Sequence, residues 1–162
     1  MAVRDILIVE DQALARMYLC ACVEKCADCR VAGTLTRADA ALRRCGDGHI
    51  DLILMDIEMP GMNGLDAARA VLEQRPECKV IFVTAYSLFQ YAHEAMHLGA
   101  CDYLLKPVNP DEVEASIRKA MRQIEAGRRL AELAPVEQEA DPEGDAAEAG
   151  ENDRNALVMA HV

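Results

Sequence analysis

The chain has 162 residues, 4% aromatic side chains, no Trp and a formal net charge of −11. This length favours one domain with an appendage, and the acidic balance offers no basic patch, so we expect no direct DNA binding. No stretch approaches the roughly 18 apolar residues of a membrane span and no secretory signal is visible, so we expect a cytoplasmic protein without a membrane anchor.

The first two strand–helix units are predicted within the first 50 residues. The apolar run 6–9 predicts a buried strand, and residues 12–26 predict a helix with Leu14, Met17, Tyr18, Ala21 and Val23 on or near its apolar side. A weaker strand is predicted over 31–34, followed by a helix over 37–45.

The next two units follow the same pattern. Apolar runs predict strands over 52–55 and 80–83, and the segments after them predict helices over 65–75 and 87–98. The apolar positions of the second of these helices are Leu88, Tyr91, Ala92, Ala95 and Met96. These runs are too short for helices and do not alternate, which is typical of strands buried on both faces of a parallel sheet.

The fifth unit has a strand over 103–105 and a last helix with a clear start. Asn109 is a good N-cap, Pro110 suits the first helical position, and Glu112 completes a capping-box spacing. Five successive units predict an α/β fold, a doubly wound five-stranded parallel sheet with helices on both faces.

The last helix is longer than such a fold requires. We expect a folded domain over 1–126, a helical extension over 127–134, and an acidic, disordered tail over 135–162. Residues 127–162 carry a net charge of −6, against −5 for residues 1–126. The apolar residues 156–162 are either a docking peptide or merely a chain end.

Polar side chains follow the predicted strands at the edge where ligands bind in open α/β sheets. Glu10 and Asp11 follow the first strand, Asp56 the third, Thr84 the fourth and Lys106 the fifth. Three carboxylates in one crevice repel each other unless a cation lies among them, and hard oxygen ligands suit Mg²⁺. Beside them, a lysine offers a positive charge and a threonine a hydrogen bond to an incoming oxyanion. This combination is suited to binding a phosphoryl group.

These residues, with residues 59–64 after Asp56, Ala85 after Thr84 and Pro107 after Lys106, resemble the receiver domain of two-component response regulators. The resemblance covers about residues 3–125 and implies a flavodoxin-like fold. It implies that Asp56 accepts a phosphoryl group from a histidine kinase or a phosphotransfer protein. It implies an Mg²⁺ cofactor that Asp11 and Asp56 bind directly, with Glu10 nearby or through water and the backbone carbonyl of Glu58 completing the site.

The resemblance also implies roles for the remaining site residues. Lys106 shares the charge of the phosphoryl oxygens, and Thr84 moves to bond one of them. Tyr103 is the aromatic switch, and the surface of helix 87–98, the fifth strand and the last helix changes in response. The bond from Lys106 to Pro107 is expected to be cis. Such a protein is no enzyme beyond self-phosphorylation from small donors and autodephosphorylation.

Several alternatives stay open. The chain is a signalling receiver with an unknown output partner, the receiver fragment of a longer transcriptional regulator, an aspartyl-phosphate phosphohydrolase, or a degenerate receiver used as a scaffold. A homodimer is possible through the last helix or through the face of 87–98 and 109–125. Tyr86 is interpreted as a shield that slows autodephosphorylation, and the side chain of Glu58 adds a further carboxylate at the mouth of the site.

The chain has seven Cys, an odd number at irregular spacing, which favours reduced thiols. Zinc binding or redox chemistry is one reading of the cluster Cys20, Cys22, Cys26 and Cys29, and core packing is the other. His93 and His97 have the spacing of a two-histidine metal face, but solvent exposure or a partner contact explains them without a metal.

Overall fold

A computed structural model describes residues 2–134 of the chain. One sheet holds five parallel strands in the order β2-β1-β3-β4-β5. The strands are β1 (Arg4–Val9), β2 (Cys29–Leu35), β3 (Leu52–Met55), β4 (Lys79–Thr84) and β5 (Asp102–Leu105). The helices between and after them are α1 (Ala13–Glu24), α2 (Ala38–Asp47), α3 (Gly64–Gln74), α4 (Phe89–His97) and α5 (Pro110–Leu133).

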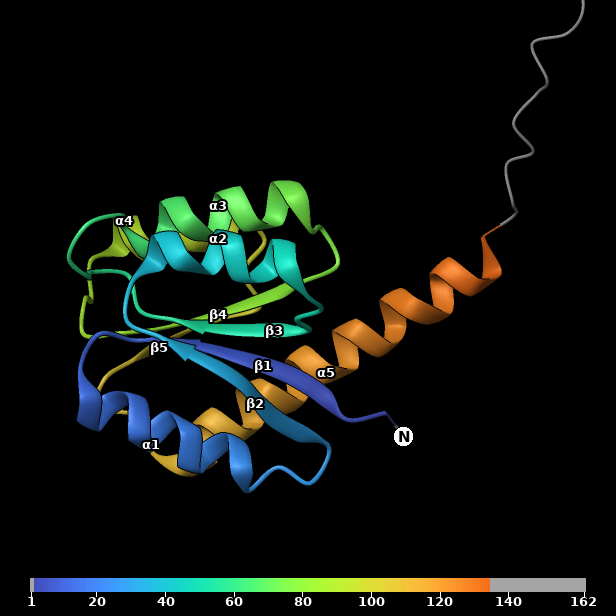
Figure 1. The fold of residues 1–162 in the computed structure, drawn as a ribbon, viewed down its shortest axis with the longest axis horizontal. Helices are drawn as coiled ribbons and strands as arrows, with labels where there is room; N and C mark the ends of the chain where they lie inside the picture. Colours follow the sequence, from blue (N-terminus) through green and yellow to red (C-terminus); the bar gives the residue numbers. More distant parts are fainter. Residues whose placement is uncertain (1, 135–162) are drawn as a thin grey trace, which may run out of the picture. The chain divides into compact units, whose positions relative to one another are not determined.

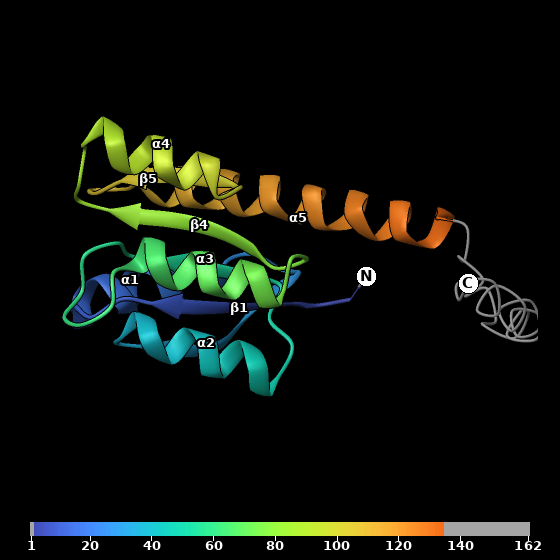
Figure 2. The same ribbon diagram turned by 90° about the horizontal axis from the view of Figure 1, so that it is seen from above.

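The helices form two layers around the sheet. Helices α2, α3 and α4 lie on one face, and α1 and α5 lie on the other (Figure 1, Figure 2). Alternate residues of each strand supply the two cores, so that Leu7 and Val9 face α2 and α3 while Ile6 and Ile8 face α1 and α5. The predicted doubly wound parallel sheet is confirmed, because strands buried on both faces need the continuous apolar runs that the sequence shows.

The predicted apolar sides of two helices were partly wrong. Leu14 and Met17 of α1 are 82% and 66% exposed, and the residues buried against the sheet are Leu19, Cys22 and Val23. Apolar residues of α1 form two stripes, and periodicity alone does not decide which stripe faces the sheet. In α4, the predicted apolar residues Leu88, at the N-cap, and Met96, within the helix, are both exposed.

Helix α5 begins as predicted and packs along its first half. The Asn109 side chain accepts a hydrogen bond from the Glu112 N–H at 2.8 Å. The buried residues of this helix that contact the sheet or end the packed stripe are Val113, Ser116, Ile117, Ala120 and Ile124. Beyond them Leu130 and Leu133 are exposed, so α5 packs on the domain only as far as Ile124. The predicted tail over 135–162, with its apolar end, lies outside the described residues.

An ionic network centred on the buried Asp51 joins α5 to the N-terminal ends of the strands. Asp51 is 4% exposed and accepts hydrogen bonds from a β1 backbone N–H at 2.8 Å and from Arg128 at 3.2 Å. His49 Nε2 lies 2.8 Å from the same carboxylate. Arg4, also buried, donates to Glu125 at 3.2 Å and approaches Asp51 at 3.7 Å.

None of the helices in the described part of the chain combines the length and apolar character that crossing a bilayer requires.

Candidate functional site

Three predicted carboxylates converge at the C-terminal end of the sheet. Because β1 and β3 are neighbours, the residues that follow them meet. One oxygen from each of Glu10, Asp11 and Asp56 lies within 4.8 Å of the others. Glu10 is fully buried and Asp56 is 8% exposed. Burial is the main cause that raises the pKa of Glu10, and the charge of Asp56 adds to it.

Lys106 reaches this cluster from the end of β5, across β4. Its Nζ lies 2.7 Å from Glu10 Oε2 and 3.2 Å from Asp56 Oδ2. Burial by itself lowers the pKa of Lys106, but the hydrogen bond to Glu10 and the charge of Asp56 outweigh it and raise the pKa. Lys106 is therefore a lasting positive charge between two carboxylates. The peptide bond from Lys106 to Pro107 is cis, as expected.

The loop after β3 holds Asp56 in position. Asp56 Oδ1 accepts a hydrogen bond from the Ile57 N–H at 2.8 Å, which directs Oδ2 toward Lys106. A Cβ at position 64 would lie 2.0 Å from the carbonyl oxygen of Asp56, so only Gly64 lets α3 begin this close to the acceptor. Gly61 has φ +91°, a conformation that L side chains rarely adopt.

Thr84 and Tyr103 lie on neighbouring strands, β4 and β5. Thr84 is fully buried, and its Oγ1 accepts from the Tyr86 N–H at 3.4 Å. The half-buried Tyr103 donates its hydroxyl hydrogen to the Tyr86 carbonyl at 2.6 Å, and its ring centroid lies 6.4 Å from that of Phe82. The aromatic side chain is thus tied to the loop that leaves Thr84. Its role as a switch stays a prediction.

Tyr86 and Tyr91 gather around Glu58 near the mouth of the site. The two rings meet edge to face with centroids 6.0 Å apart, and the Tyr91 hydroxyl lies 3.5 Å from Glu58 Oε1. Interaction with the Glu58 carboxylate is the main cause that raises the pKa of Tyr86, and the charge of Asp56 contributes. The side chain of Glu58 is exposed. The use of its backbone carbonyl as a metal ligand stays a prediction.

Sequence reasoning missed two residues that support the acid pair. Arg16 Nη1 donates to the backbone carbonyls of Glu10 at 2.9 Å and Asp11 at 3.2 Å. The Gln12 N–H donates to Glu10 Oε1 at 3.1 Å. Arg16 lies four residues after Gln12, about one helical turn. This spacing could have indicated that its guanidinium reaches the backbone at the start of α1.

The other predicted metal candidates do not assemble. Within residues 2–134, the carboxylate trio is the one group of three or more His, Cys, Asp or Glu ligand atoms within 4.8 Å of one another. The zinc interpretation of Cys20, Cys22, Cys26 and Cys29 was therefore wrong, because no three of their sulfurs lie within this distance of one another. His93 and His97 are exposed and stack with ring centroids 4.6 Å apart, without a third ligand among the described residues.

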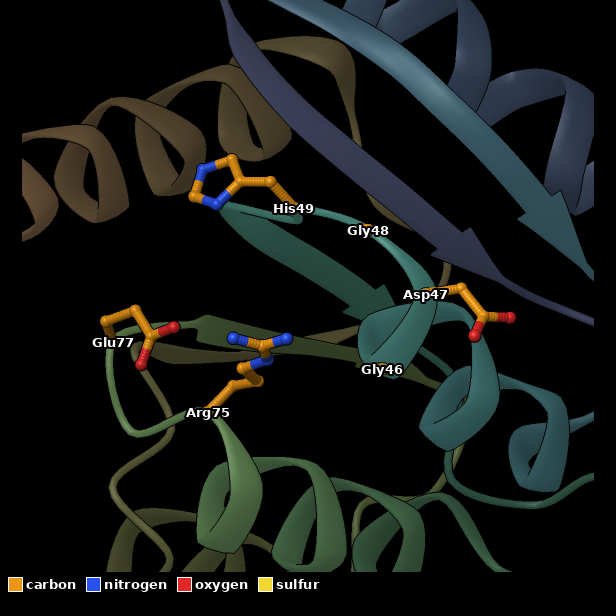
Figure 3. Close-up of a pocket in the computed structure, with 6 residues that line it drawn as sticks. All are labelled: Gly46, Asp47, Gly48, His49, Arg75 and Glu77. Carbon is orange, nitrogen blue, oxygen red and sulfur yellow. The ribbon is translucent and has the colours of Figure 1, made fainter.

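Two hollows flank the sheet at opposite ends. An apolar groove of about 230 Å³ lies beside Lys106 and is lined by Ala15, Tyr18, Leu19, Val83, Pro107 and Val108. A polar cavity of about 280 Å³ lies at the N-terminal ends of β3 and β4 (Figure 3) and is lined by Gly46, Asp47, Gly48, His49, Arg75 and Glu77. Only the first adjoins the carboxylates.

Comparison with known proteins agrees with this geometry. Residues 6–118 match the response regulator receiver domain family. The chain is 34% identical over 119 residues to the chemotaxis protein CheY of Thermotoga maritima, covering 74% of this chain and 98% of that protein. It is 31% identical over 114 residues to the response regulator UvrY of Escherichia coli, covering 70% of this chain and 52% of UvrY. A CheY-like receiver structure from Methanospirillum hungatei superposes with a TM-score of 0.72 at 27% identity, covering 78% of this chain and 99% of that one.

Proposed function

This chain belongs to the response regulator receiver family of two-component systems, and from that premise we propose that it accepts a phosphoryl group on Asp56. The donor is a phosphohistidine of a histidine kinase or a phosphotransfer protein. The observation that carries the proposal is the meeting of Asp56 with two further carboxylates and with Lys106, from three different strands, at one edge of the sheet.

The reaction is a transfer from nitrogen to oxygen. A carboxylate oxygen of Asp56 attacks phosphorus in line as the P–N bond of the donor breaks, and an acyl phosphate forms. Lys106 Nζ, 3.2 Å from Asp56 Oδ2, supplies positive charge for the phosphoryl oxygens. The apolar groove beside Lys106, with the exposed Leu14 and Met17 of α1, offers a surface on which a donor protein docks.

The donor set fits Mg²⁺. Three carboxylates against one ammonium leave an excess of negative charge in a largely buried site, and hard oxygen donors are the ligands that Mg²⁺ prefers. Glu10, Asp11, Asp56 and the backbone carbonyl of Glu58 would hold the ion, with Glu10 nearby or through water. When bound, it neutralises charge that builds up on the transferred group.

The proposed output is a change of surface. Thr84 moves to bond a phosphoryl oxygen, Tyr103 turns inward, and the face formed by α4, β5 and α5 alters its contacts with an output protein or a second copy. The chain spans about half of UvrY, so a role as the receiver part of a longer transcriptional regulator is the alternative. A cytoplasmic location also stays a prediction.

The decisive experiment is incubation with acetyl phosphate and Mg²⁺, followed by mass spectrometry of the intact chain. We expect a gain of one phosphoryl group that Asp56→Asn abolishes. The matched control is Asp66→Asn, which removes an exposed carboxylate of α3 and leaves the gain intact. An unmodified chain under conditions in which a receiver domain of known reactivity gains the phosphoryl group would contradict the proposal.

Receiver domains are regulatory proteins rather than classical enzymes, which weighs against the phosphohydrolase alternative. A separate assay distinguishes the two. Multiple turnover of a generic phosphomonoester that depends on Asp56 would favour the hydrolase, whereas a single stoichiometric phosphorylation favours the receiver.

A further inference from the structure

We propose that helix α1 clamps the two loops that carry the opposite charges of the acidic site, with Arg16 and Tyr18 as positioning residues. Arg16 holds the loop after β1 that carries Glu10 and Asp11. Tyr18 holds the loop after β5 that carries Lys106. The inference rests on the proposed function, because it assigns the two side chains to the Mg²⁺ affinity and the phosphorylation rate of that site.

The sheet by itself does not join these two loops. In the strand order β2-β1-β3-β4-β5, two strands separate β1 from β5. At about 4.8 Å from strand to strand, the ends of β1 and β5 are about 14 Å apart. Lys106 Nζ nevertheless lies 2.7 Å from Glu10 Oε2, so the lysine side chain crosses much of this span. A small shift of either loop would move the ammonium away from the acids, and an element that contacts both loops fixes the distance.

Arg16 contacts the acid pair through the backbone. The residue is half-buried, and its Nη1 donates to the carbonyl oxygens of Glu10 at 2.9 Å and Asp11 at 3.2 Å. The side chain of Gln12, at the N-cap of α1, makes no capping hydrogen bond. The guanidinium therefore ties this loop to the helix where a capping side chain does not. Because one nitrogen serves both carbonyls, it limits the positions that the attached carboxylates can take.

The sign of the charge on Arg16 separates positioning from electrostatics. A guanidinium close to the acids repels a divalent cation, so as a charge alone Arg16 weakens the binding of Mg²⁺. As a positioning residue it strengthens the binding, since it holds Glu10 and Asp11 in the orientation that the ion needs. The two roles predict opposite changes in Mg²⁺ affinity when the guanidinium is removed.

Tyr18 contacts the lysine loop through its hydroxyl group. The hydroxyl donates to the Val108 carbonyl oxygen at 2.7 Å, two residues after Lys106. Both Tyr18 and Val108 also line the apolar groove beside Lys106. The next residue of α1, Leu19, is buried in the core between the sheet and the layer of α1 and α5. The loop after β5 is thus tied to a helix whose own position the core fixes.

The clamp does not depend on the ion pairs at the centre of the site. Before transfer, Lys106 pairs with Glu10 and Asp56. In the proposed reaction the ammonium turns to the phosphoryl oxygens, so its bonds to the carboxylates weaken. The hydrogen bonds from Arg16 and Tyr18 go to backbone carbonyls and persist when that charge is redirected. Helix α1 therefore keeps both loops in place while the lysine changes partner.

The first test measures Mg²⁺ binding by the full chain without a phosphoryl donor. Titration calorimetry with MgCl₂ should give a dissociation constant about tenfold higher for Arg16→Met than for the wild type. Arg16→Lys keeps a nitrogen donor for the two carbonyls and should recover part of the loss. Arg43→Met, at an exposed position of α2, is the control and should bind as the wild type does. Binding by Arg16→Met that equals or exceeds the wild-type affinity would overturn the clamp.

The second test measures the rate of phosphorylation by acetyl phosphate at saturating Mg²⁺. Tyr18→Phe keeps the ring in the groove and loses only the hydroxyl. We expect a rate about fivefold lower than in the wild type, with an unchanged Mg²⁺ dissociation constant. A general loss of stability would not separate the two readouts in this way. A wild-type rate in Tyr18→Phe, or an equal loss of Mg²⁺ affinity and rate, would overturn the clamp.

The outcomes in the wild type separate the clamp from the proposed function. If the wild-type chain is phosphorylated and either variant matches it in its own readout, the clamp is wrong and the proposed function stands. If the wild-type chain binds Mg²⁺ but gains no phosphoryl group, the proposed function is wrong, and the titration of Arg16→Met still decides the clamp. A wild-type chain that neither binds Mg²⁺ nor gains a phosphoryl group overturns both.

Discussion

The two ends of the sheet carry similar numbers of acidic side chains but balance them differently. At the C-terminal end, Glu10, Asp11 and Asp56 face the single ammonium of Lys106. At the N-terminal end, acids and bases alternate in one network; its members are Asp5, Asp51, Glu125, Arg4, Arg30, Arg128 and His49. The first end therefore has unbalanced negative charge, whereas the second is compensated within the protein.

This difference separates function from stability. A compensated buried network costs much when one partner is removed, because the others are left charged and unpaired. In an uncompensated cluster, repulsion between the carboxylates destabilises the folded protein. A bound cation removes that repulsion and restores the stability. Removing an acid should therefore have opposite effects on folding at the two ends.

The largest expected effect concerns Lys106 at the functional end. We expect Lys106→Met to slow phosphorylation of Asp56 by acetyl phosphate by about 10²–10³-fold, since a preorganised charge on the phosphoryl oxygens is lost. Mass spectrometry of quenched time points measures the rate. Lys119→Met, at an exposed position of α5, is the control and should react like the wild type. A reduction below about threefold would refute this role.

At the compensated end, Asp51→Ala should reduce the free energy of unfolding by about 3 kcal/mol. The substitution leaves Arg4 and Arg128 without their shared carboxylate. It also leaves the backbone N–H of Asp5 in β1 without its acceptor. Urea unfolding followed by circular dichroism measures the loss. Asp66→Ala, at an exposed position, should change it by no more than ~0.5 kcal/mol, and phosphorylation of folded Asp51→Ala should persist.

Asp11→Asn should have the opposite sign. In buffer with a metal chelator we expect the unfolding free energy to rise by about 1 kcal/mol, because repulsion with Glu10 and Asp56 is relieved. Mg²⁺ at about ten times its dissociation constant should stabilise the wild type by ~1.4 kcal/mol and Asp11→Asn by much less. Equal stabilisation of both by Mg²⁺ would argue against the metal site.

The smallest effect concerns the mouth of the acidic site. Tyr86 packs edge to face on Tyr91, whose hydroxyl lies 3.5 Å from Glu58 Oε1. We expect Tyr86→Ala to speed autodephosphorylation about threefold, equivalent to ~0.7 kcal/mol. Tyr86→Phe keeps the ring and loses the hydroxyl, so it should behave as the wild type if shielding is the mechanism. A rate in Tyr86→Ala equal to that of the wild type shows the shield hypothesis to be wrong.

Much of the fold and the site was predictable because it depends on local pattern. Runs such as 52–55 and 80–83 identified the central strands, since buried parallel strands are apolar on both sides. Glu10, Asp56 and Lys106 were predicted to meet because they follow strands, and the carboxyl ends of parallel strands share one edge. The parallel direction of the strands was therefore enough to predict that these residues lie at the same edge of the sheet.

Other features depend on which side chains meet, and local pattern does not encode this. Leu14 and Met17 of α1 were predicted on the apolar side together with Val23, but packing on the sheet buries Leu19 and Cys22 beside Val23 and leaves Leu14 and Met17 exposed. The hydrogen bonds from Arg16 to the Glu10 and Asp11 carbonyls were likewise not predicted.

The sequence by itself determined the α/β order, the three carboxylates and the lysine of the acidic site, because strand ends and residue types suffice for these. Only the tertiary structure decided that Lys106 bridges Glu10 and Asp56 and that Asp51 pairs with Arg128 of α5. Contacts of this kind join residues that are distant in sequence. They exist only when the whole sheet brings its helices and loops together, since each depends on distances that no single segment specifies.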